Sequence, residues 1–442
     1  MLPLLIGSLA GVGMGVSDTV IVGHVGATDL AGVSVAVSII MSVTVAFSGF
    51  LGAISPLFAE DCGAGRPDRA QRRFMNALYA MTGVIAVTEL LLVLGYFSFD
   101  WMPLEEDVRQ VARNYMLYAF PGIPIFILTM TLKTYDDGIG KTQVAMCISF
   151  AALFLNIVLD LLFVYGAGPI KAMGGPGAAL ASTITEWLLF PIAWMLTSLL
   201  LRKSQFKPRI HFMKPDKDMI KLIFKQGLPL AIATGFESSM FLAFCVLSSW
   251  FGTPELAANQ ILFNLMSLLF MVPLALSITL SIRIGYSIGK SDSSMAQTAV
   301  STCYWLAMPA AFVLAITSYI LSDDVALLYT NDLDVVAIIS ASFLPVALYQ
   351  IGDYCQCIAN GALRGLKDTG IITIVSIVGY WGISVPLAWY LAFKGLPGME
   401  PAGFIGLWIS LCLTLYLIAL TYCPRVVRDL KILRKMFPPK NQ

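Results

Sequence analysis

Five acidic side chains lie inside long apolar stretches, where an ionised group carries a high free-energy cost. They are Asp18, Asp160, Glu186, Glu237 and Asp353. Ionisable residues within lipid usually line a cavity, pair with one another, or carry protons and ions. We therefore expect the chemistry of this protein to depend on binding positive charge at these positions.

The first group places several oxygen atoms at one depth. At about 1.5 Å rise per residue, Asp18 and Asp160 each lie roughly 6–9 Å below the outer end of their predicted helices. Asn156 precedes Asp160 by four residues, on the same helical face. Ser182 and Thr183 reach a similar depth from the next helix. These oxygens could hold a metal ion such as Na⁺, or the two carboxylates could exchange a proton. The alternative is a polar contact that only joins helices.

The second group lies nearer the predicted mid-membrane. Glu237 and Asp353 could attract a cation or carry a proton if they face each other or a cavity. The structural alternative is a pairing of these acids with Tyr349, Gln350 or Tyr354.

Glu186 follows Ser182 by four residues and could line the same part of the molecule as a cation-binding group. Alternatively, its carboxylate is hydrogen-bonded to backbone or to Trp187.

Charged groups at helix ends favour structural roles. Lys133 with Asp136 and Asp137, and Arg364 with Asp368, are predicted to anchor helices or to form ion pairs at a gate.

The composition predicts a membrane protein. Of 442 residues, 58% are hydrophobic and 12% are charged, against about 25% charged in soluble domains. The eight cysteines are scattered and the two histidines are His24 and His211, which disfavours disulfides and zinc sites. No cofactor is expected. The chain opens in an apolar segment that lacks the features of a signal peptide, so a short cytoplasmic lead could precede Met1.

Twelve segments are long and apolar enough to cross a bilayer, which needs roughly 20 residues each. They are residues 1–22, 33–59, 74–98, 110–133, 143–166, 176–201, 222–250, 256–283, 297–321, 334–362, 369–393 and 401–423. Alternate connections hold 24 of the 28 Lys and Arg residues. Because basic residues stay on the cytoplasmic side, both termini are predicted to lie in the cytoplasm.

The two halves of the chain repeat at an offset of 226 residues. The matches pair Leu2-Pro3-Leu4 with Leu228-Pro229-Leu230, Gly26 and Asp29 with Gly252 and Glu255, Gly63 with Gly289, Ala70-Gln71 with Ala296-Gln297, Lys141 with Lys367, and Gly177 with Gly403. The repeat predicts two pseudo-symmetric six-helix bundles with a substrate cavity between them. The domains would be an N-terminal lobe (1–201), a cytoplasmic linker (202–221), a C-terminal lobe (222–423) and a basic cytoplasmic tail (424–442).

In combination, several short motifs resemble the multidrug and toxic compound extrusion (MATE) family, including its NorM-type branch. They are Gly15-Val16-Ser17-Asp18-Thr19-Val20, Gly63-Ala64-Gly65, Leu155-Asn156-x-x-x-Asp160, Phe236-Glu237, Arg283-Ile284-Gly285 and Leu363-Arg364-Gly365-x-Lys367-Asp368. The sequence departs from the pattern at Asp160, where close NorM-type members often have asparagine. Both lobes therefore hold candidates for the coupling site.

The resemblance implies an all-α polytopic protein of the bacterial inner (plasma) membrane, with a V-shaped arrangement of two lobes. It would export cationic amphipathic drugs in exchange for Na⁺ or H⁺. Asp18, Asn156 and Asp160, with Ser182 or Thr183, would form the ion site, and Glu237 and Asp353 the second-lobe acids. A monomer embedded in the lipid bilayer is expected, without a nucleic-acid partner.

Other functions fit the sequence less well. A flippase or exporter for a lipid-linked precursor would favour basic groups in its cavity, whereas the intramembrane charges here are acidic. A membrane enzyme would need a His or metal cluster, or a nucleophile with a base, and none is visible in the sequence. ATP-driven transport by this chain alone is disfavoured because the sequence shows no Walker motif. A channel is disfavoured because a pore-loop signature is missing.

Overall fold

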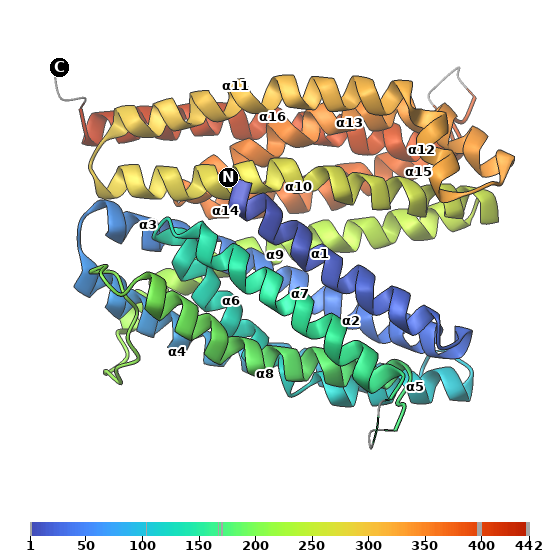
Figure 1. Cartoon of the computed structure of the whole chain (residues 1–442). Coiled ribbons are helices and arrows are strands. Elements are labelled where there is room, and N and C mark those ends of the chain that lie inside the picture. Colours follow the sequence, from blue (N-terminus) through green and yellow to red (C-terminus); the bar gives the residue numbers. More distant parts are fainter. Residues whose placement is uncertain (1, 103, 167, 169–170, 396–399, 439–442) are drawn as a thin grey trace. The chain divides into compact units, whose positions relative to one another are not determined.

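The structure is a computed structural model that describes residues 2–102, 104–166, 168, 171–395 and 400–438. Over these residues it is helical and contains no strand. The helices are α1 (Leu2–Gly23), α2 (Ala27–Gly52), α3 (Ser55–Gly63), α4 (Pro67–Ser98), α5 (Glu106–Ala119), α6 (Gly122–Gly138), α7 (Thr142–Val164), α8 (Gly175–Leu200), α9 (Lys217–Ser249), α10 (Thr253–Gly289), α11 (Ser293–Ile320), α12 (Ser322–Tyr329), α13 (Leu333–Gly365), α14 (Thr369–Ser376), the π-helix η1 (Ile377–Ser384), α15 (Val385–Phe393) and α16 (Phe404–Met436) (Figure 1).

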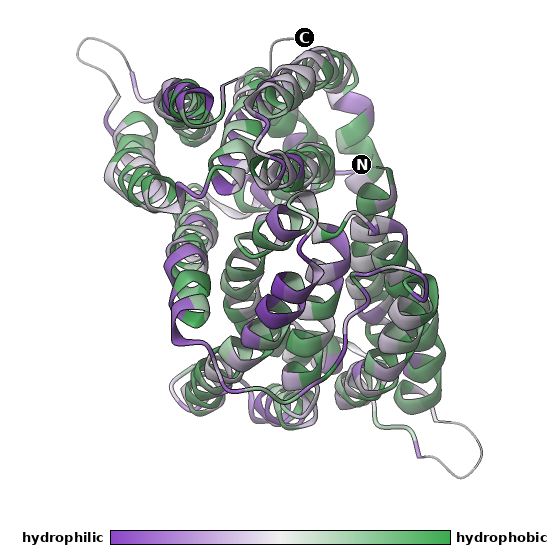
Figure 2. Ribbon diagram, turned by 90° about the vertical axis from the view of Figure 1, so that its left-hand side faces the viewer, coloured by the Kyte–Doolittle hydropathy of each residue, from purple (hydrophilic) through white to green (hydrophobic). Residues whose placement is uncertain are grey.

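The predicted number of spans is confirmed. The described residues hold eleven helices or continuous helix pairs that could cross a membrane, and twelve spans result if α5 and α6 count as one. These two helices are bent by 50°. The break falls at Pro121, whose ring cannot donate a backbone hydrogen bond. Figure 2 views the helices largely end-on and shows hydrophobic residues along most of them, with hydrophilic residues concentrated at helix ends and connections.

The last helix is longer than predicted. The predicted span ends at residue 423, whereas α16 continues through Pro424 to Met436. Arg425 lies 2.6 Å from Asp368 and 3.9 Å from Asp429, one turn further along the helix. The basic segment after residue 423 is therefore helical as far as Met436.

The chain divides into two compact units, Met1–Gly227 and Leu228–Gln442. The boundary lies within α9, after the predicted linker. The linker packs on the first unit, where the Tyr79 hydroxyl donates to the Met213 carbonyl at 2.9 Å and the Asp216 amide donates to Asn76 at 2.7 Å. The predicted lobe boundaries at 201 and 222 stay a prediction.

The repeat is visible in matching close contacts inside each unit. A Cβ on Gly138 would lie 2.8 Å from the Ser55 carbonyl oxygen, and a Cβ on Gly365 would lie 2.9 Å from the Ser281 carbonyl oxygen. Ser55 and Ser281 are 226 residues apart, whereas Gly138 and Gly365 are 227 apart. Each glycine lets two helices approach closely, which membrane helices achieve with small residues.

The predicted offset of 226 is wrong for the last helix of each half. Gly174 (φ 63°, ψ −142°) precedes α8, and Gly403 (φ 60°, ψ −145°) precedes α16 in the same left-handed conformation. The structural counterpart of Gly403 is thus Gly174, not Gly177, and Gly177 corresponds to Gly406. Insertions in the connections have widened the offset to 229.

A buried ion pair stabilises the first unit. Arg73 on α4 and Asp61 on α3 are each 1% exposed, and Arg73 Nε lies 3.1 Å from Asp61 Oδ2. Arg73 Nη1 also donates to the Leu57 carbonyl. Removing one partner of such a pair leaves the other charge buried, at a cost of about 3–5 kcal/mol.

Arg73→Met is therefore expected to lower the melting temperature of the purified protein, measured by fluorescence-detected size exclusion after heating. The matched control is Arg113→Gln, which breaks the more exposed pair with Asp100 and should cost at most about 1 kcal/mol. Equal melting temperatures for the two variants would contradict the structural role of Arg73.

Candidate functional site

The predicted N-terminal site is assembled from α1, α7 and α8. Asp18 is on α1, Asn156 and Asp160 are on α7, and Ser182 is on α8. α1 and α7 pack against each other at Gly7, where an added Cβ would be in ordinary van der Waals contact with the Met146 Cα at 3.5 Å. Two carboxylates that are distant in sequence are thereby brought to one place.

Asn156 is the centre of this cluster, and its neighbours fix the orientation of its amide. Nδ2 donates to Asp18 Oδ1 at 2.8 Å and to Asp160 Oδ2 at 3.3 Å, and the amide oxygen accepts from Ser182 Oγ at 3.2 Å. The reverse orientation would leave the amide oxygen facing the two carboxylates, which are acceptors only.

The cluster has an acceptor without a partner. Asn156 and Asp160 are fully buried, and Asp160 Oδ1 has no hydrogen bond within the described part of the chain. Asp18 is half-buried and close enough to interact electrostatically with Asp160. Tyr115 on α5 is close enough to interact electrostatically with both acids, and the sequence did not identify it. A buried acceptor of this kind has a high desolvation cost unless it binds a proton or a cation.

Two predicted members of the N-terminal site face elsewhere. The Thr183 hydroxyl donates to the Tyr118 carbonyl on α5 at 2.6 Å. Glu186 is hydrogen-bonded to Thr129 and interacts electrostatically with Lys133, both on α6. Of the neighbouring residues Ser182 and Thr183, it is therefore Ser182 that contacts Asn156.

The C-terminal acids lie on α9 and α13. The Tyr380 hydroxyl donates to Glu237 Oε1 at 3.2 Å, and Gln356 Nε2 donates to the Tyr380 hydroxyl at 3.3 Å. Asp353 is 7% exposed and interacts electrostatically with Glu237. The structure thus brings the two predicted acids together, with Tyr380 as a partner that the sequence did not identify.

Tyr380 projects from the π-helix η1, in which an extra residue per turn changes the direction of the side chains. The next residue, Trp381, donates from Nε1 to the Phe236 carbonyl at 3.2 Å and to Ser239 Oγ at 3.0 Å. These bonds hold η1 against α9 on both sides of Glu237. No signal in the sequence distinguishes this π-helical segment from an ordinary helix.

Of the three structural partners that the sequence suggested for these acids, Tyr354 interacts electrostatically with Asp353, whereas Gln350 and Tyr349 have contacts elsewhere. Gln350 Nε2 donates to Ser318 Oγ at 3.1 Å. Tyr349 packs edge-on against Trp408, although it also interacts electrostatically with both acids. Glu237 is therefore hydrogen-bonded across to η1 rather than to α13.

A family model described as MatE matches residues 3–162 and again residues 229–390. These two segments cover most of the chain. The chain belongs to the MatE family. The two matches begin 226 residues apart, at 3 and 229, in agreement with the repeat.

Curated relatives of this MatE chain carry the name multidrug resistance protein. NorM of Photobacterium profundum is 33% identical over 92% of this chain and 90% of its own length. NorM of Vibrio vulnificus is 34% identical, with 92% and 89% covered. MdtK of Yersinia pseudotuberculosis is 31% identical, with 96% and 93% covered.

Solved structures share the fold of this MatE chain at lower identity. An outward-facing multidrug resistance MATE family transporter of the MOP superfamily has a TM-score of 0.87 at 17% identity, with 98% of this chain and 95% of the other covered. A eukaryotic MATE transporter has a TM-score of 0.85 at 19% identity, with 98% and 96% covered.

The charged groups at helix ends of the MatE chain differ from the prediction. Asp368 pairs with Arg425, whereas Arg364 Nη2 donates to Ser277 Oγ at 2.5 Å. Asp136 accepts from the Thr197 hydroxyl at 2.6 Å.

Lys133 agrees with the predicted arrangement in its interaction with Asp137 and differs from it in its other contacts. It donates from Nζ to Ser149 Oγ at 2.8 Å and interacts electrostatically with Asp137 and Glu186. Within the described ranges, no group of three or more His, Cys, Asp or Glu side chains could hold a metal ion.

Proposed function

We propose that this protein is a secondary active multidrug efflux transporter that exports cationic amphipathic compounds in exchange for Na⁺ or H⁺. The observation that supports it most directly is the cluster around Asn156, where Asp160 Oδ1 is buried without a hydrogen-bond partner. Such an acceptor favours binding of a positive ion. The names of the curated relatives support multidrug efflux.

The position of the Asn156 amide between the two carboxylates suggests how an ion would bind in the N-terminal unit. Without an ion, Nδ2 bridges the Asp18 and Asp160 carboxylates. With a cation between the acids, a half-turn of the amide would direct its oxygen to the ion and Nδ2 to Ser182 Oγ. A proton would instead reside on one carboxylate and reduce the repulsion between the pair.

The C-terminal acids are the proposed binding groups for the positive charge of the exported compound. Glu237 and Asp353 both lie in a low-dielectric interior, where attraction for a cation is stronger than in water. Ion binding in the N-terminal unit would favour a state with lower affinity for the exported compound, and the compound would then be released. By the same coupling, the bound compound would lower the affinity for the ion.

We also propose a bacterial inner-membrane location with both termini in the cytoplasm and a monomeric state. The relatives come from bacteria, and the basic residues lie in alternate connections.

The test is transport of ethidium, a fluorescent cation, by the full chain reconstituted in vesicles. Na⁺ and pH gradients are imposed separately, with the membrane potential clamped. Transport against the ethidium gradient should be driven by at least one of the two ion gradients. If neither gradient drives transport above that of empty vesicles, the antiport proposal is wrong.

A further inference from the structure

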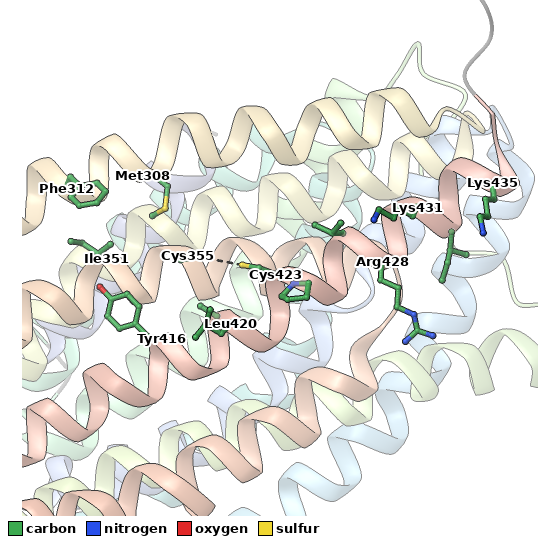
Figure 3. A pocket seen from close by; sticks show the side chains of 14 residues that line it. Met308, Phe312, Ile351, Cys355, Tyr416, Leu420, Cys423, Arg428, Lys431 and Lys435 are labelled. Carbon is green, nitrogen blue, oxygen red and sulfur yellow. Dashed lines mark hydrogen bonds between the residues drawn. The ribbon is translucent and has the colours of Figure 1, made fainter.

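A groove opens on the surface of the second unit between α11, α13 and α16, with a volume of about 940 Å³. Its apolar part includes Met308, Phe312, Ile351, Tyr416 and Leu420 (Figure 3). Phe312 is 51% exposed and Leu420 is 70% exposed. Since α11, α13 and α16 all qualify as membrane spans, this groove faces the hydrocarbon region of a bilayer.

One end of the groove carries a row of positive charges. Arg428, Lys431 and Lys435 line it from successive turns of α16 (Figure 3). Spacings of three and four residues place them on one face of the helix. All three are exposed. Arg428 also interacts electrostatically with the adjacent Asp429. Arg425, by contrast, is paired with Asp368 at 2.6 Å.

The dimensions of the groove match one leaflet. From Tyr416 to Arg428 the helix rises by about 18 Å, at about 1.5 Å per residue. Half of a hydrocarbon core of roughly 30 Å is about 15 Å. If Tyr416 lies near the bilayer centre, Arg428 reaches the headgroup level, and the flexible side chains of Lys431 and Lys435 can extend back toward it.

We propose that this groove binds an anionic phospholipid, with an acyl chain along Phe312, Ile351 and Leu420 and the phosphate at Arg428, Lys431 and Lys435. Basic pockets at the ends of membrane helices attract anionic headgroups by charge complementarity. A cationic drug would be repelled by the same three side chains. The site is thus distinct from the proposed ion and substrate sites and does not depend on the proposed function.

Native mass spectrometry of the delipidated full chain tests this proposal. Phosphatidylglycerol and phosphatidylcholine with identical acyl chains are titrated separately. We expect phosphatidylglycerol to bind about tenfold more tightly, because the basic side chains attract its net negative charge and detergent and salt screen this attraction only in part. Arg428→Gln, Lys431→Gln and Lys435→Gln combined should remove this preference. Arg434→Gln, on the same helix but outside the groove, should keep it.

A second pair of variants tests the acyl-chain part. Leu420→Trp should fill the groove and weaken binding of both lipids by about tenfold. Leu417→Trp, at another exposed position of α16, should leave binding unchanged. The proposal is overturned if wild-type protein binds both lipids equally, if Arg434→Gln is as defective as the triple variant, or if Leu420→Trp binds both lipids like wild type.

Discussion

Asp18→Asn is expected to abolish the dependence of ethidium efflux on the counter-ion gradient while leaving the protein folded in the membrane. Asparagine has nearly the same shape and can still bond to Asn156 and Ser182, which both contact Asp18. It removes one of the two charges that attract the ion. Hydrogen bonds to charged groups contribute about 1.5–3 kcal/mol, so ion affinity should fall roughly 10- to 150-fold.

The readout for Asp18→Asn is the initial rate of efflux in vesicles with and without each gradient, alongside ethidium binding measured by fluorescence polarisation. Binding should be retained, because Asp18 lies in the first unit and the proposed substrate acids lie in the second. Asp107→Asn changes the net charge equally at an exposed helix start and should transport normally. Gradient-driven efflux at the wild-type rate in Asp18→Asn would remove Asp18 from the coupling mechanism.

Glu237→Gln is expected to weaken binding of cationic compounds by at least about tenfold. The glutamine carbonyl can still accept the hydrogen bond from Tyr380, so the local packing is maintained while the charge is lost. Loss of a charged partner in a partly desolvated site is worth about 1.5–3 kcal/mol. Fluorescence polarisation of ethidium with purified protein measures the change.

Two matched variants separate charge from hydrogen bonding at Glu237. Tyr380→Phe keeps the carboxylate and removes only its hydrogen-bond donor, so it should reduce affinity much less than Glu237→Gln. Asp334→Asn, in the exposed first turn of α13, should have no effect. If Glu237→Gln and wild type bind ethidium equally, the C-terminal acids do not hold the positive charge of the substrate.

The two candidate sites are not copies of each other, although the units are repeats. At the offset of 226, Asp18 corresponds to Phe244 and Glu237 corresponds to Gly11. The helical framework was duplicated, whereas the acidic side chains differ between the halves. This asymmetry permits one unit to bind the counter-ion and the other the exported compound.

The number of spans, the repeat of the two halves and the acids within apolar segments were all predictable from the order of residues alone. Hydrophobic length and charge distribution suffice for these features, because water and lipid act on each segment separately. They also suffice to identify Asp18, Asp160, Glu237 and Asp353 as acidic residues inside apolar segments, where ionised groups are rare.

The contacts between side chains of different helices could not be predicted in this way. Ser182 and Thr183 are neighbours in sequence, but they project in different directions, so one reaches Asn156 and the other reaches Tyr118. Tyr380 reaches Glu237 from a π-helical turn that residue types do not announce. Such contacts depend on the rotation and register of each helix against its neighbours, and these are fixed by packing between distant segments rather than by local hydrophobicity.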